Sequence, residues 1–230
     1  MRSALTVLLS GGLDSTTLLH YLRHTRPGVD IHALTFQYGQ RHACEVQCAV
    51  WQANAAGVAA HEVFDLDVLR RLAGAATALI DGAPVPALSD VPPAQLNQPP
   101  TYVSHRNLLL LSLAAAYSEA HGIVEVFYAA QHQRCYGYWD CTEKFLQRMN
   151  DLLALNRGSP VKVYAPFAAL DKAAVLQIGL RLGVDYSHTW TCYRGGTQAC
   201  GVCPACIERL AAFQATGATD PLQYAPPSVR

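Results

Sequence analysis

The sequence predicts an α/β fold, a doubly wound parallel sheet followed by a small cysteine-rich unit. Three observations support this prediction. Short apolar runs typical of buried strands alternate with segments of helical periodicity as far as residue 182. Four cysteines then fall between Cys192 and Cys206. With 230 residues, of which 51% are hydrophobic, the chain is long enough to bury a full core.

The first strand, LTVLL, ends in a turn that is the most informative local feature of the chain. Ser10, Gly11 and Gly12 form this turn, and a helix is expected to begin directly after them. The first N–H groups of a helix lack backbone partners and the helix dipole favours negative charge there, so the turn is a candidate phosphate site. Glycine permits the positive φ and the close approach to phosphate that such a site needs. The alternative is an ordinary turn with Asp14 or Ser15 as a helix cap.

Polar side chains after the glycines support the phosphate site. Ser15, Thr16 and Thr17 add hydroxyl groups to that of Ser10. A carboxylate inside a phosphate cradle repels its ligand unless a cation lies between them, so Asp14 predicts bound Mg²⁺. No lysine follows the glycines, so the loop differs from GxxxxGK[ST] and cleavage of the outermost phosphate is not indicated.

The rest of the chain is expected to continue the alternation of strands and helices. Ligands of such sheets bind at the carboxyl ends of the strands, where Ser10 and Gln37 fall. Residues 74–100 interrupt the alternation and hold six of the 13 prolines, which predicts a mobile flap over the site. The later strands are expected at residues 30–36, 61–67, 124–130 and 161–166, and the later helices at residues 43–56, 108–121, 142–156 and 171–182.

Charge and targeting signals restrict the partners. The 17 basic and 17 acidic residues cancel, so small-molecule substrates are favoured over direct binding of nucleic acid. No export signal and no apolar run long enough for a membrane span is recognised, and we therefore expect a cytoplasmic protein. Clustered thiols in that reducing compartment are metal ligands more often than disulfides.

The four clustered cysteines have the spacing of a metal site. Gaps of seven, two and two residues suit a closed, structural, tetrahedral Zn²⁺ site, and free buried thiols or an iron–sulfur cluster are the alternatives. The expected ligands are Cys192, Cys200, Cys203 and Cys206. Of the other cysteines, Cys44 and Cys48 are expected to face the core, Cys135 is isolated, and Cys141 is a candidate for substrate contact. The expected units are a nucleotide-binding domain at 1–186, a zinc subdomain at 187–215 and a tail at 216–230.

Seven segments together resemble one enzyme family. They are LLSGGLDSTT, LTFQYGQRH, TYVSHRN, GYWDC, APF with Lys172 beyond it, TWTCY and CGVCPACIER, and they span residues 8–209. The chain resembles the 7-cyano-7-deazaguanine synthase (QueC) family of PP-loop ATP pyrophosphatases, which have an adenine nucleotide alpha hydrolase-like fold. The resemblance implies a ligase of queuosine biosynthesis that adenylates 7-carboxy-7-deazaguanine with ATP. It also implies that ammonia then gives the amide and, after a second adenylation, the nitrile, with release of AMP and pyrophosphate.

The same resemblance implies roles for individual residues. The loop from Ser10 to Thr17, including Gly11, Gly12 and Asp14, would bind pyrophosphate and Mg²⁺, with Arg41 also at the nucleotide. Asp14, Arg106 and Lys172 would act in catalysis, and the alternative for each arginine is an exposed surface position. The residues implied in deazaguanine binding, for which core packing is the alternative at the tyrosines, are Tyr38, Gln40, Asn107, Tyr138 and Asp140. His42, His105 and His132 are candidate general bases with no preference among them.

Four positions depart from the family pattern. Ser104 and His105 replace Pro or Asp and Gly, and Trp139 and Thr142 replace Pro and Arg. These changes surround the expected acceptor pocket, so one alternative is a paralogue that stops at the amide or joins the acid to an amine on another molecule, such as a protein. A zinc-knuckle module that binds RNA or protein without catalysis, and a tRNA-thiolating PP-loop enzyme, are the further alternatives. We expect a homodimer.

Overall fold

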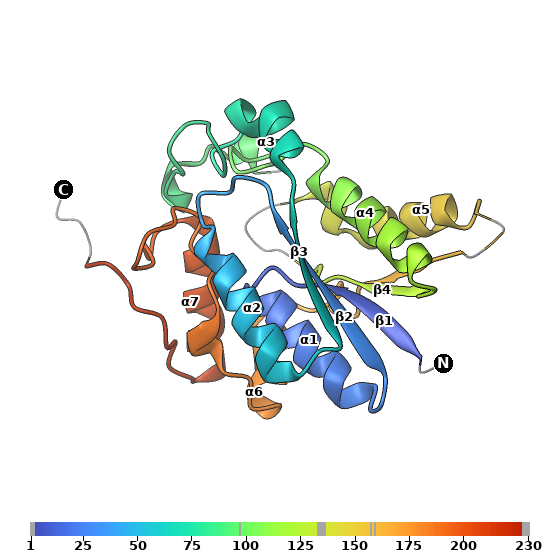
Figure 1. Ribbon diagram of the computed structural model, residues 1–230. Helices are drawn as coiled ribbons and strands as arrows, with labels where there is room; N and C mark the ends of the chain where they lie inside the picture. The colour runs from blue at the N-terminus through green and yellow to red at the C-terminus, as the bar shows by residue number, and fades with distance from the viewer. Residues whose placement is uncertain (1–2, 97, 133–136, 157, 159, 227–230) are drawn as a thin grey trace.

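The protein is a parallel β-sheet covered by helices on both faces (Figure 1). A computed structural model describes residues 3–96, 98–132, 137–156, 158 and 160–226. The five strands of the sheet follow the order β3-β2-β1-β4-β5, and all neighbouring pairs run parallel. The strands are β1 (Ala4–Leu8), β2 (Asp30–Gln37), β3 (Ala60–Asp65), β4 (Glu125–Phe127) and β5 (Lys162–Tyr164). The predicted doubly wound α/β fold is thereby confirmed.

Side chains of alternating strand positions build two cores on opposite faces of the sheet. Leu5 and Val7 of β1 pack with α1, α2, α6 and α7, whereas Leu34 of β2 and Val126 of β4 pack with α4 and α5. This period of two is the expected result of the strand pleat, in which successive side chains point to opposite faces. The helices are α1 (Leu13–Thr25), α2 (Cys44–Ala56), α3 (Asp67–Ala73), α4 (Arg106–Ala120), α5 (Glu143–Leu153), α6 (Lys172–Arg181) and α7 (Pro204–Thr216).

Local sequence signals explain where two of these helices begin. The Thr142 side chain accepts a hydrogen bond from the Phe145 N–H at the start of α5, and the Asp171 side chain accepts one from the Ala174 N–H at the start of α6. Strand β4 is shorter than the predicted 124–130, because its ladder with β5 ends where Tyr128 N donates to the Tyr164 carbonyl. Helices α3 and α7 were not predicted.

The described residues between 74 and 100 pack onto the domain with several buried side chains. Leu79 and Ile80 are 1% and 2% exposed and join the core that contains Tyr38. The segment also forms three short 3-10 turns, Gly74–Ala76, Leu88–Asp90 and Pro93–Gln95. These contacts fix its position beside the carboxyl end of β2, and the mobility of the segment stays a prediction.

The C-terminal part of the chain is joined directly to the main core. Phe213 of α7 packs in the same core as α1 and α6. The Arg209 guanidinium is fully buried and contacts both oxygens of the Asp220 carboxylate at 2.8 and 2.9 Å, which fixes the following segment against α7. Cys135 lies outside the described residues. Within the described part of the chain, no helix is both long and apolar enough to cross a bilayer.

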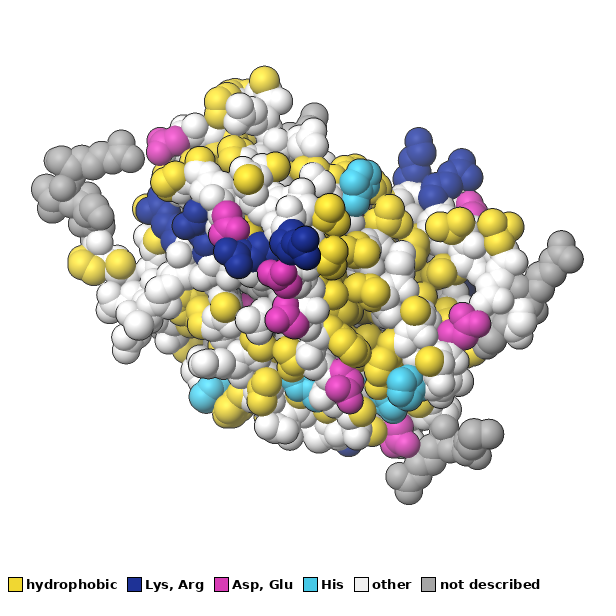
Figure 2. Space-filling model, turned by 45° about the horizontal axis from the view of Figure 1, so that its top comes forward, with side chains coloured by type: hydrophobic (Ala, Val, Ile, Leu, Met, Phe, Trp, Pro, Cys, Tyr) yellow, Lys and Arg dark blue, Asp and Glu magenta, His cyan; other side chains and the backbone are white. Residues whose placement is uncertain are grey.

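Charges of both signs adjoin one another on the surface. Arg70 Nε lies 2.9 Å from Asp81 Oδ2, and Arg148 Nη1 lies 3.3 Å from Asp151 Oδ2. Figure 2 shows basic beside acidic side chains on one face, together with a band of hydrophobic side chains. Apolar bands of this kind are typical of protein–protein contact surfaces. The homodimer stays a prediction.

Candidate active site

A cavity of about 260 Å³ opens at the carboxyl ends of β1, β2 and β4. The loop after β1, the start of α2, the start of α4 and the segment before the clustered cysteines all contribute to its walls. This is the edge of the sheet at which parallel α/β folds bind their ligands. The polar residues that line it are Ser10, Asp14, Ser15, Tyr38, His42, Glu45, Arg106, Asn107, Gln131, Lys172, Thr191, Tyr193 and Glu208.

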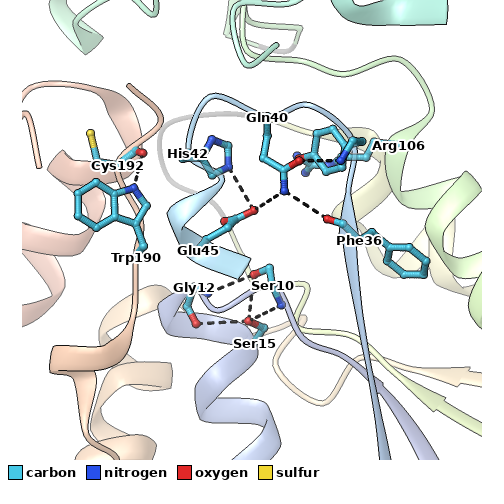
Figure 3. Close-up of polar contacts among 11 residues, drawn as sticks. Ser10, Gly12, Ser15, Phe36, Gln40, His42, Glu45, Arg106, Trp190 and Cys192 are labelled. Atoms are coloured by element: carbon cyan, nitrogen blue, oxygen red, sulfur yellow. Dashed lines mark hydrogen bonds and ion pairs between the residues drawn. The ribbon is translucent and has the colours of Figure 1, made fainter. Parts of the chain in front are cut away.

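The loop after β1 presents the start of α1 to this cavity. Ser10 N and Ser10 Oγ lie 3.2 and 3.0 Å from Ser15 Oγ, and Gly12 N donates to Ser10 Oγ at 3.2 Å (Figure 3). Gly12 is the cap residue of α1 and offers no side-chain acceptor to the first N–H groups of the helix. Because no side chain of the cap residue occupies those N–H groups, they are suited to bind an anion.

Gly11 is the position at which this loop requires glycine. Its φ of +85° lies in the left-handed region. A Cβ there would lie 2.0 Å from the Glu45 carbonyl oxygen and 2.7 Å from Ala49 N on α2. The Gly11 carbonyl accepts a hydrogen bond from Trp190 N at 3.0 Å. The loop is therefore held between α2 and the segment that leads to the cysteines.

Asp14 and Lys172 form an ion pair at the bottom of the loop. Lys172 Nζ lies 2.6 Å from Asp14 Oδ2, and the two side chains are 12% and 23% exposed. The other carboxylate oxygen, Asp14 Oδ1, is buried and has no hydrogen-bond partner among the described residues. An oxygen of this kind next to a phosphate-binding loop suits a hard cation such as Mg²⁺.

The start of α4 brings Arg106 and Asn107 to the cavity. Arg106 Nη1 donates to the Tyr38 hydroxyl at 3.2 Å, and Asn107 N donates to Asp140 Oδ2 at 3.3 Å. The buried Asp140 carboxylate thus caps α4 from behind Asn107 and does not line the cavity. Burial raises the pKa of the Cys141 thiol to about 12, so this cavity residue is a neutral thiol at neutral pH.

Several predicted residues lie outside the cavity wall. Thr16 and Thr17 are fully buried, and Thr17 Oγ1 lies 2.7 Å from the Tyr186 hydroxyl within the core. The Arg41 guanidinium donates to the carbonyl groups of Ala78 and Gly82 at 3.0 and 2.7 Å. These groups support the walls from behind.

Tyr138 and Gln40 also lie behind the residues that face the cavity. The Tyr138 hydroxyl is 2.9 Å from Thr101 Oγ1. The Gln40 amide is buried and contacts Glu45, Phe36 and the Tyr38 N–H. The cavity residues that sequence reasoning missed include Glu45, in the first turn of α2 and three positions after His42. Their spacing of three residues across the start of α2 brings the two side chains to within 3.4 Å of each other.

The four predicted cysteines come together beside the cavity. Their sulfur atoms all lie within 4.8 Å of one another, and the Cys200 and Cys206 sulfurs are 4.0 Å apart. Zn–S bonds of about 2.3 Å place tetrahedral sulfurs about 3.8 Å apart, so the cluster fits a zinc ion. Cys200 N and Cys203 N each donate to a cysteine sulfur at 3.3 Å, as expected around thiolate ligands. Since Thr191, Tyr193 and Ala205 line the cavity, the cluster holds one of its walls.

Comparison with known proteins identifies the family of this chain. The family model described as "Queuosine biosynthesis protein QueC" matches residues 4–217. The chain belongs to the QueC family. Among similar QueC relatives, the 7-cyano-7-deazaguanine synthase of Alteromonas mediterranea is 40% identical over 227 residues, covering 97% of this chain and 100% of the relative. The enzyme of the same name from Chromohalobacter salexigens is 42% identical over 219 residues, covering 95% and 85% of the two chains.

Solved structures of two other proteins share the fold with this QueC family member. NMN synthetase from Francisella tularensis superposes with a TM-score of 0.52 at 15% identity, covering 95% of this chain and 79% of that one. The U34-tRNA thiolase NcsA from Methanococcus maripaludis, solved with its [4Fe-4S] cluster, gives a TM-score of 0.50 at 14% identity, covering 80% and 57%. At these identities the likeness concerns the fold alone.

Proposed function

We propose that this chain is a 7-cyano-7-deazaguanine synthase, an ATP-dependent ligase that forms C–N bonds. In this proposal 7-carboxy-7-deazaguanine is adenylated, ammonia gives the amide, and a second adenylation gives the nitrile, with AMP and pyrophosphate released. The observation that carries the proposal is one cavity shared by the anion-binding loop, the Asp14–Lys172 pair and Arg106. Membership of the QueC family, whose relatives bear this enzyme's name, supports the choice of substrate.

The proposed chemistry needs positioning and charge neutralisation more than a strong nucleophile. A carboxylate is a poor electrophile and hydroxide a poor leaving group, whereas an acyl adenylate loses AMP readily. The enzyme must hold the acid against the α phosphate and stabilise the departing pyrophosphate. Cations and N–H groups fixed in advance do this at low reorganisation cost.

We assign the loop residues to the pyrophosphate. Ser10, Gly12, Ser15 and the first N–H groups of α1 would hold its oxygens, with Gly11, Thr16 and Thr17 setting the shape of the loop. Asp14 Oδ1 would hold Mg²⁺, which supplies positive charge to the leaving group. In this proposal Lys172 Nζ, which contacts Asp14 in the structure, would move to a phosphate oxygen when nucleotide binds.

The remaining assignments concern the acid and the metal. Arg106 would neutralise the carboxylate or the α phosphate, and Tyr38 and Asn107 would contact the deazapurine. Gln40, Tyr138 and Asp140 would position those groups, and Arg41 would hold the nucleotide side of the cavity through residues 78–82. The four clustered cysteines would hold a structural Zn²⁺ ion.

One observation favours a second candidate, the amide-forming or conjugating paralogue. His105 has a φ of +54°, a left-handed conformation suited to the glycine of the family pattern. Its ring lies 5.6 Å from that of Trp139, which is 40% exposed, and the Trp139 indole N–H donates to the Tyr102 hydroxyl at 3.0 Å. Two departures thus form one exposed aromatic patch, which suits an acceptor larger than ammonia.

Mass analysis of the product distinguishes the two candidates. The protein is incubated with 7-carboxy-7-deazaguanine, ATP, Mg²⁺ and ammonium. The nitrile is expected for the first candidate, and the amide or a larger adduct for the second. Absence of pyrophosphate release that depends on the acid would refute both.

A further inference from the structure

A buried polar cluster lies where the chain enters α2, and two of its members, His42 and Glu45, have no role in the assignments above. It comprises Gln40, His42 and Glu45, which are 3%, 4% and 9% exposed. His42 and Glu45 line the cavity, and Gln40 lies directly behind them. Figure 3 shows the three side chains together above the loop of Ser10 and Gly12. Polar groups buried to this degree need partners.

Gln40 fixes the orientation of Glu45. The Gln40 side-chain carbonyl accepts a hydrogen bond from Tyr38 N at 2.8 Å, so its NH₂ group must point the other way. That NH₂ group donates to the Phe36 carbonyl at 3.2 Å and to Glu45 Oε1 at 3.1 Å. Both N–H groups and the carbonyl of the Gln40 amide are thus hydrogen-bonded, and this amide holds the Glu45 carboxyl in one position.

Glu45 in turn orients the His42 ring. His42 Nε2 lies 3.4 Å from Glu45 Oε1. The other ring nitrogen, His42 Nδ1, is buried and has no hydrogen-bond partner among the described residues. A proton on Nε2 facing the carboxyl leaves the Nδ1 lone pair free to accept another. This is the arrangement of a carboxylate–histidine base, in which one nitrogen is oriented and the other reacts.

We propose that His42 is the general base of the ammonia step and that Glu45 is its positioning residue. The inference rests on the proposed function. Ammonia attacks the acyl carbon of the adenylate, the new C–N bond forms, and the carbonyl π electrons move to oxygen. His42 Nδ1 takes the proton from the nitrogen, the carbonyl re-forms, and the C–O bond breaks with its electron pair leaving on AMP. His42 then releases the proton to solvent.

Other charged and titratable groups surround the pair. Burial raises the pKa of Glu45, and the nearby His42 and Arg106 oppose this rise. The His42 ring lies 5.7 Å from that of Tyr193. Arg106 of α4 and Tyr38 after β2 are the groups on neighbouring elements that interact electrostatically with Glu45. On α2 itself, Cys44 and Cys48 do so.

The test separates the adenylation step from the ammonia step. His42→Gln keeps a donor that reaches Glu45 but lacks an acceptor at the Nδ1 position. Exchange of pyrophosphate into ATP, driven by 7-carboxy-7-deazaguanine without ammonia, reports adenylation. Amide or nitrile formation, plotted against free ammonia from pH 6 to 9, reports the second step. His20→Gln is the matched control, because His20 contacts Gln52 at 3.0 Å and does not line the cavity.

We expect His42→Gln to lose about 10²- to 10⁴-fold more in ammonia-dependent turnover than in exchange of pyrophosphate into ATP. We also expect its acidic limb in the pH profile to disappear, and that of Glu45→Gln to shift to lower pH because an anionic partner stabilises the imidazolium. If His42→Gln does not fold, the same two measurements are made on His42→Asn. Equal losses in both steps, or none, would overturn the base assignment alone. Wild-type protein without acid-dependent exchange would instead overturn the proposed function.

Discussion

Substituting Gly11 by alanine tests whether the loop after β1 is held against α2. The left-handed φ of +85° costs an alanine about 1 to 2 kcal/mol. The added Cβ, 2.0 Å from the Glu45 carbonyl oxygen, also forces α2 to shift, and such overpacking costs about 1 to 3 kcal/mol. The sum of about 2 to 5 kcal/mol is a large part of a domain stability of about 5 to 15 kcal/mol.

Gly28→Ala is the matched control for this substitution. Gly28 has nearly the same φ, +80°, but a Cβ there meets nothing within 4 Å. We expect its loss in the free energy of unfolding to stay at about 1 to 2 kcal/mol, measured by urea denaturation with an unchanged slope. Gly11→Ala should lose clearly more, and nucleotide binding should weaken with it. Equal losses in the two variants would refute the close packing of loop and helix.

Three further substitutions test the parts that hold the cavity. Arg209→Ala leaves the buried Asp220 carboxylate without its partner, so urea denaturation should show a loss of about 3 to 5 kcal/mol in the free energy of unfolding. Arg148→Ala, which removes an exposed ion pair, should show almost no loss. Similar losses in the two variants would contradict a stabilising role of the buried Arg209–Asp220 pair. Cys203→Ser should remove the bound zinc from metal analysis and lower the melting temperature sharply, whereas Cys48→Ser should keep one zinc per chain; metal retained in Cys203→Ser would exclude the proposed site. Burial raises the pKa of Glu45 above the ordinary 4.5, so above that pH the unfolded state binds fewer protons at this carboxyl, and the contribution of Glu45 to the free energy of unfolding falls as pH rises. Glu45→Gln removes this contribution, so its free energy of unfolding should gain on that of the wild type as pH rises; a difference that does not change with pH would show that the carboxyl is not buried.

The sequence predicts most of the fold because buried strands and helix starts leave periodic, local signals. Helix α3 escaped prediction because its seven residues bury only Leu69 and Ala73, too few for a helical period to emerge. The close set of four cysteines was predictable from spacing alone, since metal geometry restricts it. Arg209 was not, because an arginine on a helix normally faces solvent and its partner lies beyond the end of that helix.

The walls of the site were predictable only in part, because motifs give positions and not directions. Asp14 and Lys172 lie far apart in the sequence but meet at 2.6 Å, as expected for ends of β1 and β5 that share one edge. The directions in which Thr17 and Arg41 point depend on tertiary partners that no local pattern reveals. The same holds for Glu45, whose neighbours in space come from the ends of β2 and α4.

The most direct test of the proposed chemistry follows the carboxylate oxygens of the substrate. With 7-carboxy-7-deazaguanine labelled by ¹⁸O in its carboxylate, attack on the α phosphate transfers one labelled oxygen to each AMP formed. Mass spectrometry of the nucleotides should therefore show AMP with one ¹⁸O and pyrophosphate with none. Label in pyrophosphate or phosphate, or unlabelled AMP during turnover, would contradict activation of the acid at the loop of Ser10 to Thr17.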